Sequence, residues 1–275
     1  MMPSLNPSLL ASLRKEHIRN LAWMEQSNAD VLVHSNDVPH GYVVPPHHHR
    51  RTQVLCVSSG VVLVATARGR WLIPPGHALV IPRGLEHSVE MYSDVSMRSI
   101  YLASQAGRAA AEVPVVLEVT ELARQLLAEA IRLQGLDEDR HRAGLVLALL
   151  VDEIDRLAEQ PLGLPFPASD RLSALCRRFL EQPVSGARID EWANSLNMSR
   201  RSFTRFFREE TGVSFATWRQ QACLFACLPR LANGEAVTTV ALEAGYESVP
   251  AFTTMFRRML GTSPRLYFKA RRAAA

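Results

Sequence analysis

Two kinds of hydrophobic pattern divide this chain. Between about residues 30 and 103, short β-rich runs alternate with glycine and proline turns, which predicts strands. The runs are Val54–Val57, Val61–Ala65, Trp71–Ile73, Ala78–Ile81, Ser88–Met91 and Met97–Leu102. Many short strands without intervening helices predict a small β-barrel or jelly roll. After them, apolar residues recur at helical spacing over Val119–Gln134 and Asp137–Glu159, which predicts two helices.

The last part of the chain contains one helical pattern twice, from Ile189 to Phe207 and from Val237 to Phe256. Each copy has a small residue, then four residues later a residue that tolerates positive φ, and then a helix with aromatic residues on one face. The residues are Ala193, Asn197, Phe203, Phe206 and Phe207 in the first copy, and Ala241, Gly245, Phe252 and Phe256 in the second. A tight helix-turn-helix needs this pattern, and two in tandem indicate a protein that reads DNA.

Glycines and a proline-rich segment mark the ends of these elements. Gly212 and Gly261 each follow the last aromatic residue of a copy by five positions, where a left-handed helix C-cap is expected. Gln160–Pro167 is predicted to be a linker, and Ser169 is predicted to cap a helix over Asp170–Glu181. The pattern therefore predicts a two-domain α+β protein: a β-barrel domain over residues 1–115, a helical linker over 116–167, and an all-α tandem helix-turn-helix domain over 168–275.

The repeated pattern resembles the C-terminal domain of the AraC/XylS family of bacterial transcription regulators. The matching residues are Ala193, Ser199, Phe207 and Gly212 in the first copy, and Ala241, Gly245, Tyr246, Phe252, Phe256 and Gly261–Pro264 in the second. The resemblance implies one long helix between the copies, at about Phe215–Ala232. Pro229 lies inside that stretch and is expected to kink or end the helix locally.

The second helix of each copy is expected to enter the major groove of DNA. In the first copy Ser199 is the expected N-cap, and the residues left to face outward are Arg200, Arg201, Thr204, Arg205 and Arg208. By resemblance, Arg201, Thr204 and Arg205 match the family positions that meet base edges. Arginine can bind guanine through two hydrogen bonds. The corresponding residues of the second copy carry no charge; they are Val249, Pro250, Thr253 and Thr254.

We therefore expect the first copy to dominate sequence specificity. Each arginine could equally contact a phosphate, because at least half of the contacts in such complexes go to the DNA backbone. The preferred phosphate-binding candidates are Arg257, Arg258, Arg265 and Lys269.

The β-rich region carries spaced histidines and glycines that resemble the two motifs of the cupin fold. The first runs Gly41-x5-His47-x-His49-x3-Gln53-x6-Gly60, and the second runs Gly76-x5-Pro82-x-Gly84-x2-His87. Because side chains alternate along a strand, His47 and His49 are expected on one face and His48 on the other. His77 is expected on a turn surface rather than among ligands.

In metal-binding cupins the matching positions supply three histidines and a glutamate. The resemblance therefore implies a metal site of His47, His49, Gln53 and His87, with Gln53 at the glutamate position. Three imidazoles suit Zn, Fe, Ni or Cu, but a neutral amide oxygen binds more weakly than a carboxylate. Alternatively, the histidines only hydrogen-bond inside the barrel, and both interpretations remain open. A small effector could also bind there; its candidate lining residues are His47, His49, Gln53, Trp71 and His87.

Charge is unevenly distributed. Residues 168–275 hold 16 Lys and Arg against 9 Asp and Glu, whereas residues 1–167 hold 15 against 18. A basic C-terminal part suits a phosphate backbone. The four cysteines have neither zinc-ribbon nor disulfide-scaffold spacing, and no secretion signal or membrane span is recognised, so we expect a reducing cytoplasm.

The preferred function is a transcription regulator whose N-terminal cupin senses a small molecule and controls DNA binding; it is not expected to be an enzyme. The expected partners are double-stranded DNA, an unknown effector, RNA polymerase and a second copy of the chain. The apolar faces of the two linker helices could cover the open side of the barrel, pair two subunits as the family resemblance implies, or do both. One alternative is a metal-dependent cupin enzyme with an accessory DNA-binding domain, which Gln53 disfavours. Another is a nucleoid-type binder without a preferred sequence. The sequence does not decide between activator and repressor.

Overall fold

The protein is described here by a computed structural model that covers residues 5–104, 107–134 and 139–272, with side chains to residue 268. The chain forms two compact units. One contains residues 1–66 and 73–161 and is called the β unit; the other contains residues 67–72 and 162–274 and is called the helical unit. No helix among the described residues is long and apolar enough to cross a membrane.

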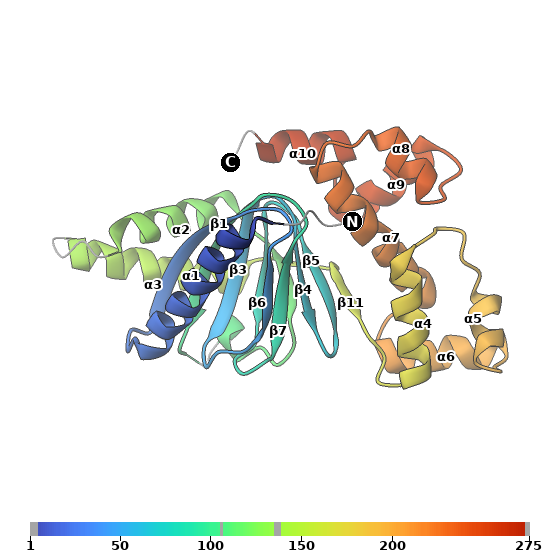
Figure 1. Cartoon of the computed structure of the whole chain (residues 1–275), viewed down its shortest axis with the longest axis horizontal. Helices are drawn as coiled ribbons and strands as arrows, with labels where there is room; N and C mark the ends of the chain where they lie inside the picture. The colour runs from blue at the N-terminus through green and yellow to red at the C-terminus, as the bar shows by residue number, and fades with distance from the viewer. Residues whose placement is uncertain (1–4, 105–106, 135–138, 273–275) are drawn as a thin grey trace. The chain divides into compact units, whose positions relative to one another are not determined.

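Eleven strands among the described residues form two sheets (Figure 1). They are β1 (Val31–Val38), β2 (Val43–His47), β3 (Thr52–Ser59), β4 (Val62–Thr66), β5 (Gly69–Ile73), β6 (His77–Ile81), β7 (His87–Met91), β8 (Val95–Leu102), β9 (Val115–Glu118), β10 (Glu159–Gln160) and β11 (Gly163–Pro165). The first sheet has the order β1-β8-β3-β6-β9-β10 and the second β11-β5-β4-β7-β2. All six predicted strands are confirmed, and the predicted β fold takes the form of a two-sheet jelly roll.

Successive side chains on the central strands of the first sheet point alternately to its two faces, which contact two different buried environments. On one face, Val54, Cys56 and Ile100 join a core with helices α2 (Glu121–Leu133) and α3 (Arg140–Arg156). On the other face, Gln53 and Leu55 of β3 line a cavity in the interior of the β unit. This period-two alternation carries apolar residues to the helices, and both apolar and polar residues to the interior.

The two linker helices are confirmed in position and are slightly shorter than the pattern predicted. Thr120 caps α2 by accepting a hydrogen bond from the Ala123 amide. The predicted start of the second helix, Asp137, lies outside the described residues. A short 3-10 helix, η1 (Gly107–Ala110), precedes β9.

An N-terminal helix, α1 (Pro7–Gln26), was not predicted from the sequence. Asn6 caps it by accepting from the Ser8 amide, and Pro7 occupies its first turn, where the missing N–H costs nothing. Helix α1 runs across the strands of the β unit (Figure 1), and its residues line the interior cavity.

The helical unit contains seven helices among its described residues. They are α4 (Asp170–Glu181), α5 (Ile189–Ser195), α6 (Arg200–Thr211), α7 (Phe215–Ala232), α8 (Val237–Glu243), α9 (Val249–Leu260) and α10 (Pro264–Arg272). The two helix-turn-helix modules, α5–α6 and α8–α9, lie at opposite ends of the long helix α7 (Figure 1). The predicted bounds of α4 and of the linking helix are confirmed.

Two details differ from the sequence expectations. Helix α7 does not end at Pro229 but continues to Ala232, and Pro229 itself is buried. The expected linker Gln160–Pro167 contains β10 and β11, and β11 pairs with β5 through Gly163 opposite Trp71. Backbone pairing with an available strand therefore outweighed the local preference of a proline-rich segment for an irregular path.

Candidate metal centre and nucleic-acid interface

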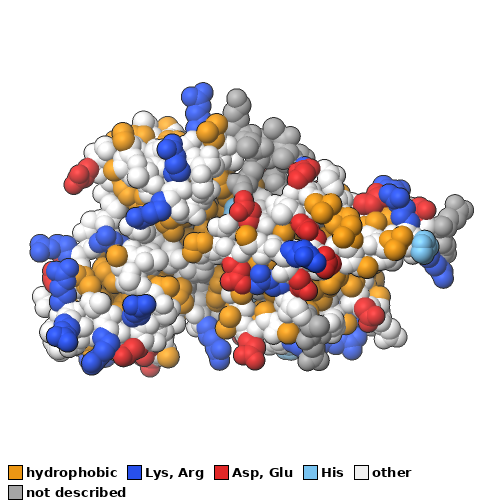
Figure 2. Space-filling model, turned by 180° about the vertical axis from the view of Figure 1, so that it is seen from behind, with side chains coloured by type: hydrophobic (Ala, Val, Ile, Leu, Met, Phe, Trp, Pro, Cys, Tyr) orange, Lys and Arg blue, Asp and Glu red, His pale blue; other side chains and the backbone are white. Residues whose placement is uncertain are grey.

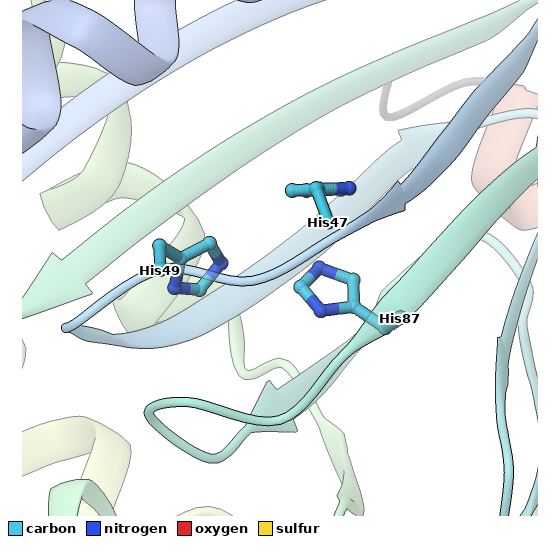
Figure 3. A group of neighbouring side chains, drawn as sticks. All are labelled: His47, His49 and His87. Carbon is cyan, nitrogen blue, oxygen red and sulfur yellow. The ribbon is translucent and has the colours of Figure 1, made fainter.

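Three histidines meet between the end of β2 and the start of β7 (Figure 3). One ring nitrogen of each lies within 4.8 Å of those of the other two. His47 and His87 are paired across the two strands. His49 lies two residues beyond the end of β2, so the expectation that it shares a strand face with His47 is wrong. The turn after the strand brings its ring to the cluster instead. His48 is exposed and also lies beyond the end of β2, so the expected alternation of strand faces does not apply to it.

The hydrogen bonds of the three rings fix which nitrogen is free. The Nδ1 atoms of His47, His49 and His87 face the carbonyl oxygens of Pro45, Arg51 and Leu85 at 2.9, 2.7 and 2.9 Å. A carbonyl oxygen only accepts, so each Nδ1 carries the proton and donates it. In a neutral ring, Nε2 then holds a bare lone pair. This backbone support is the arrangement that orients metal-binding histidines.

Burial keeps the rings neutral. It lowers the pKa of His47 and His49, and it lowers that of His87 to about 3, where the neighbouring His47 and His49 add to the effect. His87 Nε2 is buried and has no hydrogen-bond partner among the described residues. A buried lone pair without a donor is costly, and a metal ion would satisfy it. The residues therefore fit a transition-metal ion.

Gln53 lies next to this cluster. Its Nε2 donates to Ser99 Oγ at 2.9 Å, and its Oε1 faces His49 Nε2 at 3.1 Å. In this orientation two acceptors, the Gln53 oxygen and the bare His49 nitrogen, face each other, and a cation between them would stabilise the contact. If the amide were turned over, Gln53 would instead donate a hydrogen bond to His49. The amide oxygen would be the fourth donor to a bound ion, and a weak one because it is neutral.

A cavity of about 70 Å³ adjoins the histidines and is lined by His47 and Gln53. Its walls come from α1 and from the inner faces of both sheets. Tyr42 contributes a hydroxyl that has no partner among the described residues. The lining mixes apolar side chains such as Leu55 and Met97 with polar ones such as Asn20 and Asp37, so a ligand there would meet both kinds of surface.

Sequence reasoning missed the contribution of α1 to this site. His17 packs edge-on against His47, with 4.9 Å between the ring centroids, and burial lowers its pKa to about 4. Nothing in the spacing of the β motifs points to His17, because its helix precedes them in the chain. Tyr42 and Tyr101 also line the cavity without having been predicted.

Two other residues lie away from where they were expected. Trp71 does not line the cavity; its ring packs against Gly163 in the helical unit, where a Cβ on that glycine would come within 2.9 Å of Trp71 Nε1. His77 was expected on a turn surface but is buried at the start of β6, with Nδ1 3.2 Å from the Pro75 carbonyl oxygen.

In the first helix-turn-helix module the turn and caps match the prediction. Asn197 has a φ of 56°, and Ser199 caps α6 by accepting from the Ser202 amide. Phe203 and Phe207 are fully buried, which leaves the opposite face to polar residues. The side chains exposed there are Arg200, Arg201, Thr204, Arg205 and Arg208.

Few of these exposed side chains of α6 form strong interactions with neighbouring residues. Arg200 and Arg205 make long ion pairs with Asp190 (3.8 Å) and Glu209 (3.7 Å), which are worth little at an exposed surface. Thr204 donates its hydroxyl to the Arg200 carbonyl oxygen. The guanidinium groups are therefore available to a nucleic acid, and Figure 2 shows Lys and Arg side chains over the helical unit.

The second module repeats the geometry with a different surface. Gly245 has a φ of 76°, Ser248 caps α9, and Pro250 occupies its first turn. Pro250 and Thr254 are exposed, and Val249 and Thr253 are half-buried. Cations appear only in the last turn of this helix, at Arg257 and Arg258, both exposed. Arg265 is exposed at the start of α10; the side chain of Lys269 lies outside the described residues.

Comparison with known proteins identifies both parts of the chain. Residues 28–150 match the model of the AraC-like ligand binding domain, and residues 192–270 match that of a helix-turn-helix domain. The chain belongs to the AraC family of transcriptional regulators. It is therefore a DNA-binding transcription regulator with an N-terminal ligand-binding domain, as the sequence predicted.

Two named relatives support the assignment. The HTH-type transcriptional regulator NimR of Escherichia coli (strain K12) is 29% identical over 226 residues, which is 81% of each chain. The HTH-type transcriptional regulator RipA of Corynebacterium glutamicum is 30% identical over 105 residues, covering 38% of this chain and 31% of RipA. Among solved structures, one of ToxT from Vibrio cholerae covers 88% of this chain and 98% of its own, with 11% identity and a TM-score of 0.36.

Proposed function

We propose that this AraC-family regulator reads its operator mainly through α6. The observation that supports this is the row of exposed arginines along α6, whereas the first turns of α9 carry no charged side chain and its cations lie only in the last turn. Guanidinium groups can bind guanine O6 and N7 together, whereas Thr253 and Thr254 offer only a hydroxyl and a methyl group. Helix α6 therefore supplies the base contacts, and Arg257 and Arg258 hold the backbone.

Footprinting upstream of its own gene and the adjacent transcription unit tests DNA recognition directly. A discrete protected site is expected. Uniform protection without a boundary would instead support a nucleoid-type binder and would contradict a sequence-specific regulator. RNA polymerase is the proposed partner at such a site.

We also propose that the ligand-binding domain holds a divalent transition metal through His47, His49 and His87, with Gln53 as the weak fourth donor. The partnerless Nε2 of His87 supports this assignment. Bound there, the ion would supply a Lewis acid beside the cavity, to which a lone pair of the effector could bind. The effector would occupy the cavity between α1 and the two sheets, and its binding would control DNA binding.

Metal analysis of protein purified without a His-tag tests this proposal. About one ion per chain is expected, together with a rise in Tm on adding Zn²⁺ or Ni²⁺ that a chelator reverses. His87→Ala should abolish both effects, whereas His48→Ala should leave them unchanged because His48 is exposed outside the cluster. A parent protein that binds neither ion would show that the histidines serve only as a scaffold.

We propose that the protein is not an enzyme. The relatives named above are transcriptional regulators, and the oxygen donor at the histidine cluster is neutral rather than a carboxylate that could act as a base. Stoichiometric iron together with turnover of a diketone or a thiol would favour the alternative, a cupin enzyme.

A homodimer is the proposed assembly. Leu145 and Leu149 lie one turn apart on α3 and are exposed, with exposed fractions of 60% and 47%. Leu122 of α2 is also exposed. A second copy would cover these leucines. Sedimentation of the Leu145→Asp variant should show a shift toward monomer if α3 forms the interface.

A further inference from the structure

A second cavity, of about 310 Å³, lies within the helical unit and away from the histidine cluster. The linking helix α7 and helix α9 form most of its wall, and Ser185 and Tyr246 close it. Ser185 holds the α4–α5 loop against the second module, because its amide donates to the Ala244 carbonyl oxygen at 3.0 Å. The cavity is thus bounded by the α4–α5 loop, the linking helix α7 and the second helix-turn-helix module.

The charge around this cavity is positive and unbalanced. Arg219 and Arg258 line it, and no Asp or Glu does. Among the described residues their hydrogen bonds go to neutral acceptors: Arg219 donates to the Ala187 carbonyl oxygen, and Arg258 donates to Gln220 Oε1. By contrast, Arg230, which lies on α7 like Arg219, forms ion pairs with Glu235 and Glu243 at 2.6 Å each.

Two buried groups in the wall have hydrogen-bonding capacity left over. Tyr246 Oη and Arg219 Nε are buried and have no partner among the described residues. Burial also raises the pKa of Tyr246, so its hydroxyl keeps its proton and remains a donor. An unpaired buried donor costs on the order of 1–3 kcal/mol, and an acceptor in the cavity would offset that cost.

We propose that this cavity is a binding site for an oxyanion, a carboxylate or a phosphate, held by Arg219, Arg258 and Tyr246. Two guanidinium groups and a phenol hydroxyl are all donors, and they match an acceptor that carries several oxygen atoms. Cys223, Ala251 and Met255 add an apolar wall. The site therefore suits a small organic anion with an apolar body.

Occupation of the site would act on DNA binding. Thr254 and Arg258 line the cavity and also belong to the proposed DNA-binding surface of α9. An anion that holds Arg258 withdraws it from the DNA phosphates, so anion and operator should compete. Linkage requires the competition to be reciprocal: the operator must weaken anion binding by the same factor.

The experiment titrates the full-length protein, free of DNA, with benzoate, benzamide and inorganic phosphate by calorimetry. Saturable binding of benzoate but not of the neutral, equally shaped benzamide is expected. Arg258→Gln and Tyr246→Phe should each weaken it by roughly tenfold, the loss expected for one charge-assisted hydrogen bond. Arg257→Gln is the matched control, because Arg257 is exposed on the same helix but does not line the cavity.

The anion could come from a free molecule or from the DNA backbone, and a gel-shift series separates the two. If no probe binds without DNA, but Tyr246→Phe and Arg258→Gln each weaken operator binding, and Arg258→Gln alone lowers its salt dependence by about one charge, the site receives a duplex phosphate. If free anions bind and compete with operator, the site takes a small molecule. If the probes do not bind and Tyr246→Phe leaves operator affinity and its salt dependence unchanged, there is no oxyanion site.

Discussion

The two helix-turn-helix modules share a backbone and differ in surface chemistry. Both turn through a residue with positive φ, Asn197 or Gly245, and both end the second helix at a left-handed glycine, Gly212 or Gly261. The outer face of α6 carries arginines along its length, whereas that of α9 begins with valine, proline and threonine. Buried and turn positions are constrained by packing and sterics, but exposed positions are free to take different roles on the same scaffold.

The largest expected effect is the loss of stability when a buried aromatic ring is removed from either module. Comparing the two losses tests whether the modules depend equally on their aromatic cores. Phe207→Ala and Phe256→Ala each remove a fully buried ring. Each should lower the free energy of unfolding by about 3–5 kcal/mol, measured by denaturant titration. Phe206→Ala is the control, because Phe206 is only half-buried and should cost less. Unequal losses for the two buried rings would show that one module tolerates a cavity better than the other.

The difference in surface chemistry predicts unequal losses of DNA affinity. Arg201→Ala or Arg205→Ala should weaken operator binding by about 1–3 kcal/mol and relax one base position if the contact is to guanine. Thr253→Ala and Thr254→Ala should each cost less, because no charged hydrogen bond is lost. Gel-shift titrations measure all four variants. Parent-like binding of both arginine variants would contradict the assignment of α6 as the main reading helix.

The positive-φ residues in the two turns allow the backbone requirements of the two modules to be compared. A Cβ on Gly245 would lie at ordinary contact distances, 3.5 Å from the Ser185 amide nitrogen, so only its φ of 76° opposes a side chain. Gly245→Ala should therefore cost about 1–2 kcal/mol of stability, measured by thermal unfolding. Asn197→Gly should change stability by less, since asparagine already adopts positive φ there. A large loss at Asn197 would mean that its side chain has a role beyond the turn.

The smallest effect concerns the phosphate contacts of α9. Arg257→Gln should weaken binding to specific and non-specific duplexes alike and reduce the slope of log K against log salt by about one. Fluorescence anisotropy at several salt concentrations gives this slope. A loss confined to the specific operator would instead indicate a base contact and would make the two modules more alike than their sequences suggest.

The sequence predicted the helical unit more completely than the histidine site. The turns and caps of α6 and α9 are local decisions, made by residues within a few positions of one another, such as Ser199 capping α6 and Gly212 ending it. The start of α4 differs, because Ser169 makes no side-chain capping hydrogen bond and its amide donates to Glu210 instead. The histidine site depends on residues far apart in the chain. His47 and His87 were predicted as site residues because the spacing of the two motifs resembles a known fold. His17 was not, because no sequence motif indicated its helix.

Corrections to the sequence predictions arise where long-range packing outweighed local preference. Pro229 does not end α7, whose buried residues hold the helix in place around it. The proline-rich segment after α3 contains strand β11 because its backbone pairs with that of β5. Trp71, placed in the effector cavity by sequence reasoning, fills space beside Gly163 instead.

By itself, the sequence determined six of the strands, the two linker helices, the helices and turns of the repeated modules, and the side chains exposed on α6 and α9. These features follow from hydrophobic period, from backbone φ preferences and from hydrogen bonds between near neighbours. Only the tertiary structure decided that a ring nitrogen from each of three histidines lies close to the other two, that α1 lines the cavity beside them, and that Arg219, Arg258 and Tyr246 line a second cavity. Those arrangements depend on contacts between segments distant in the chain, and no local preference encodes them.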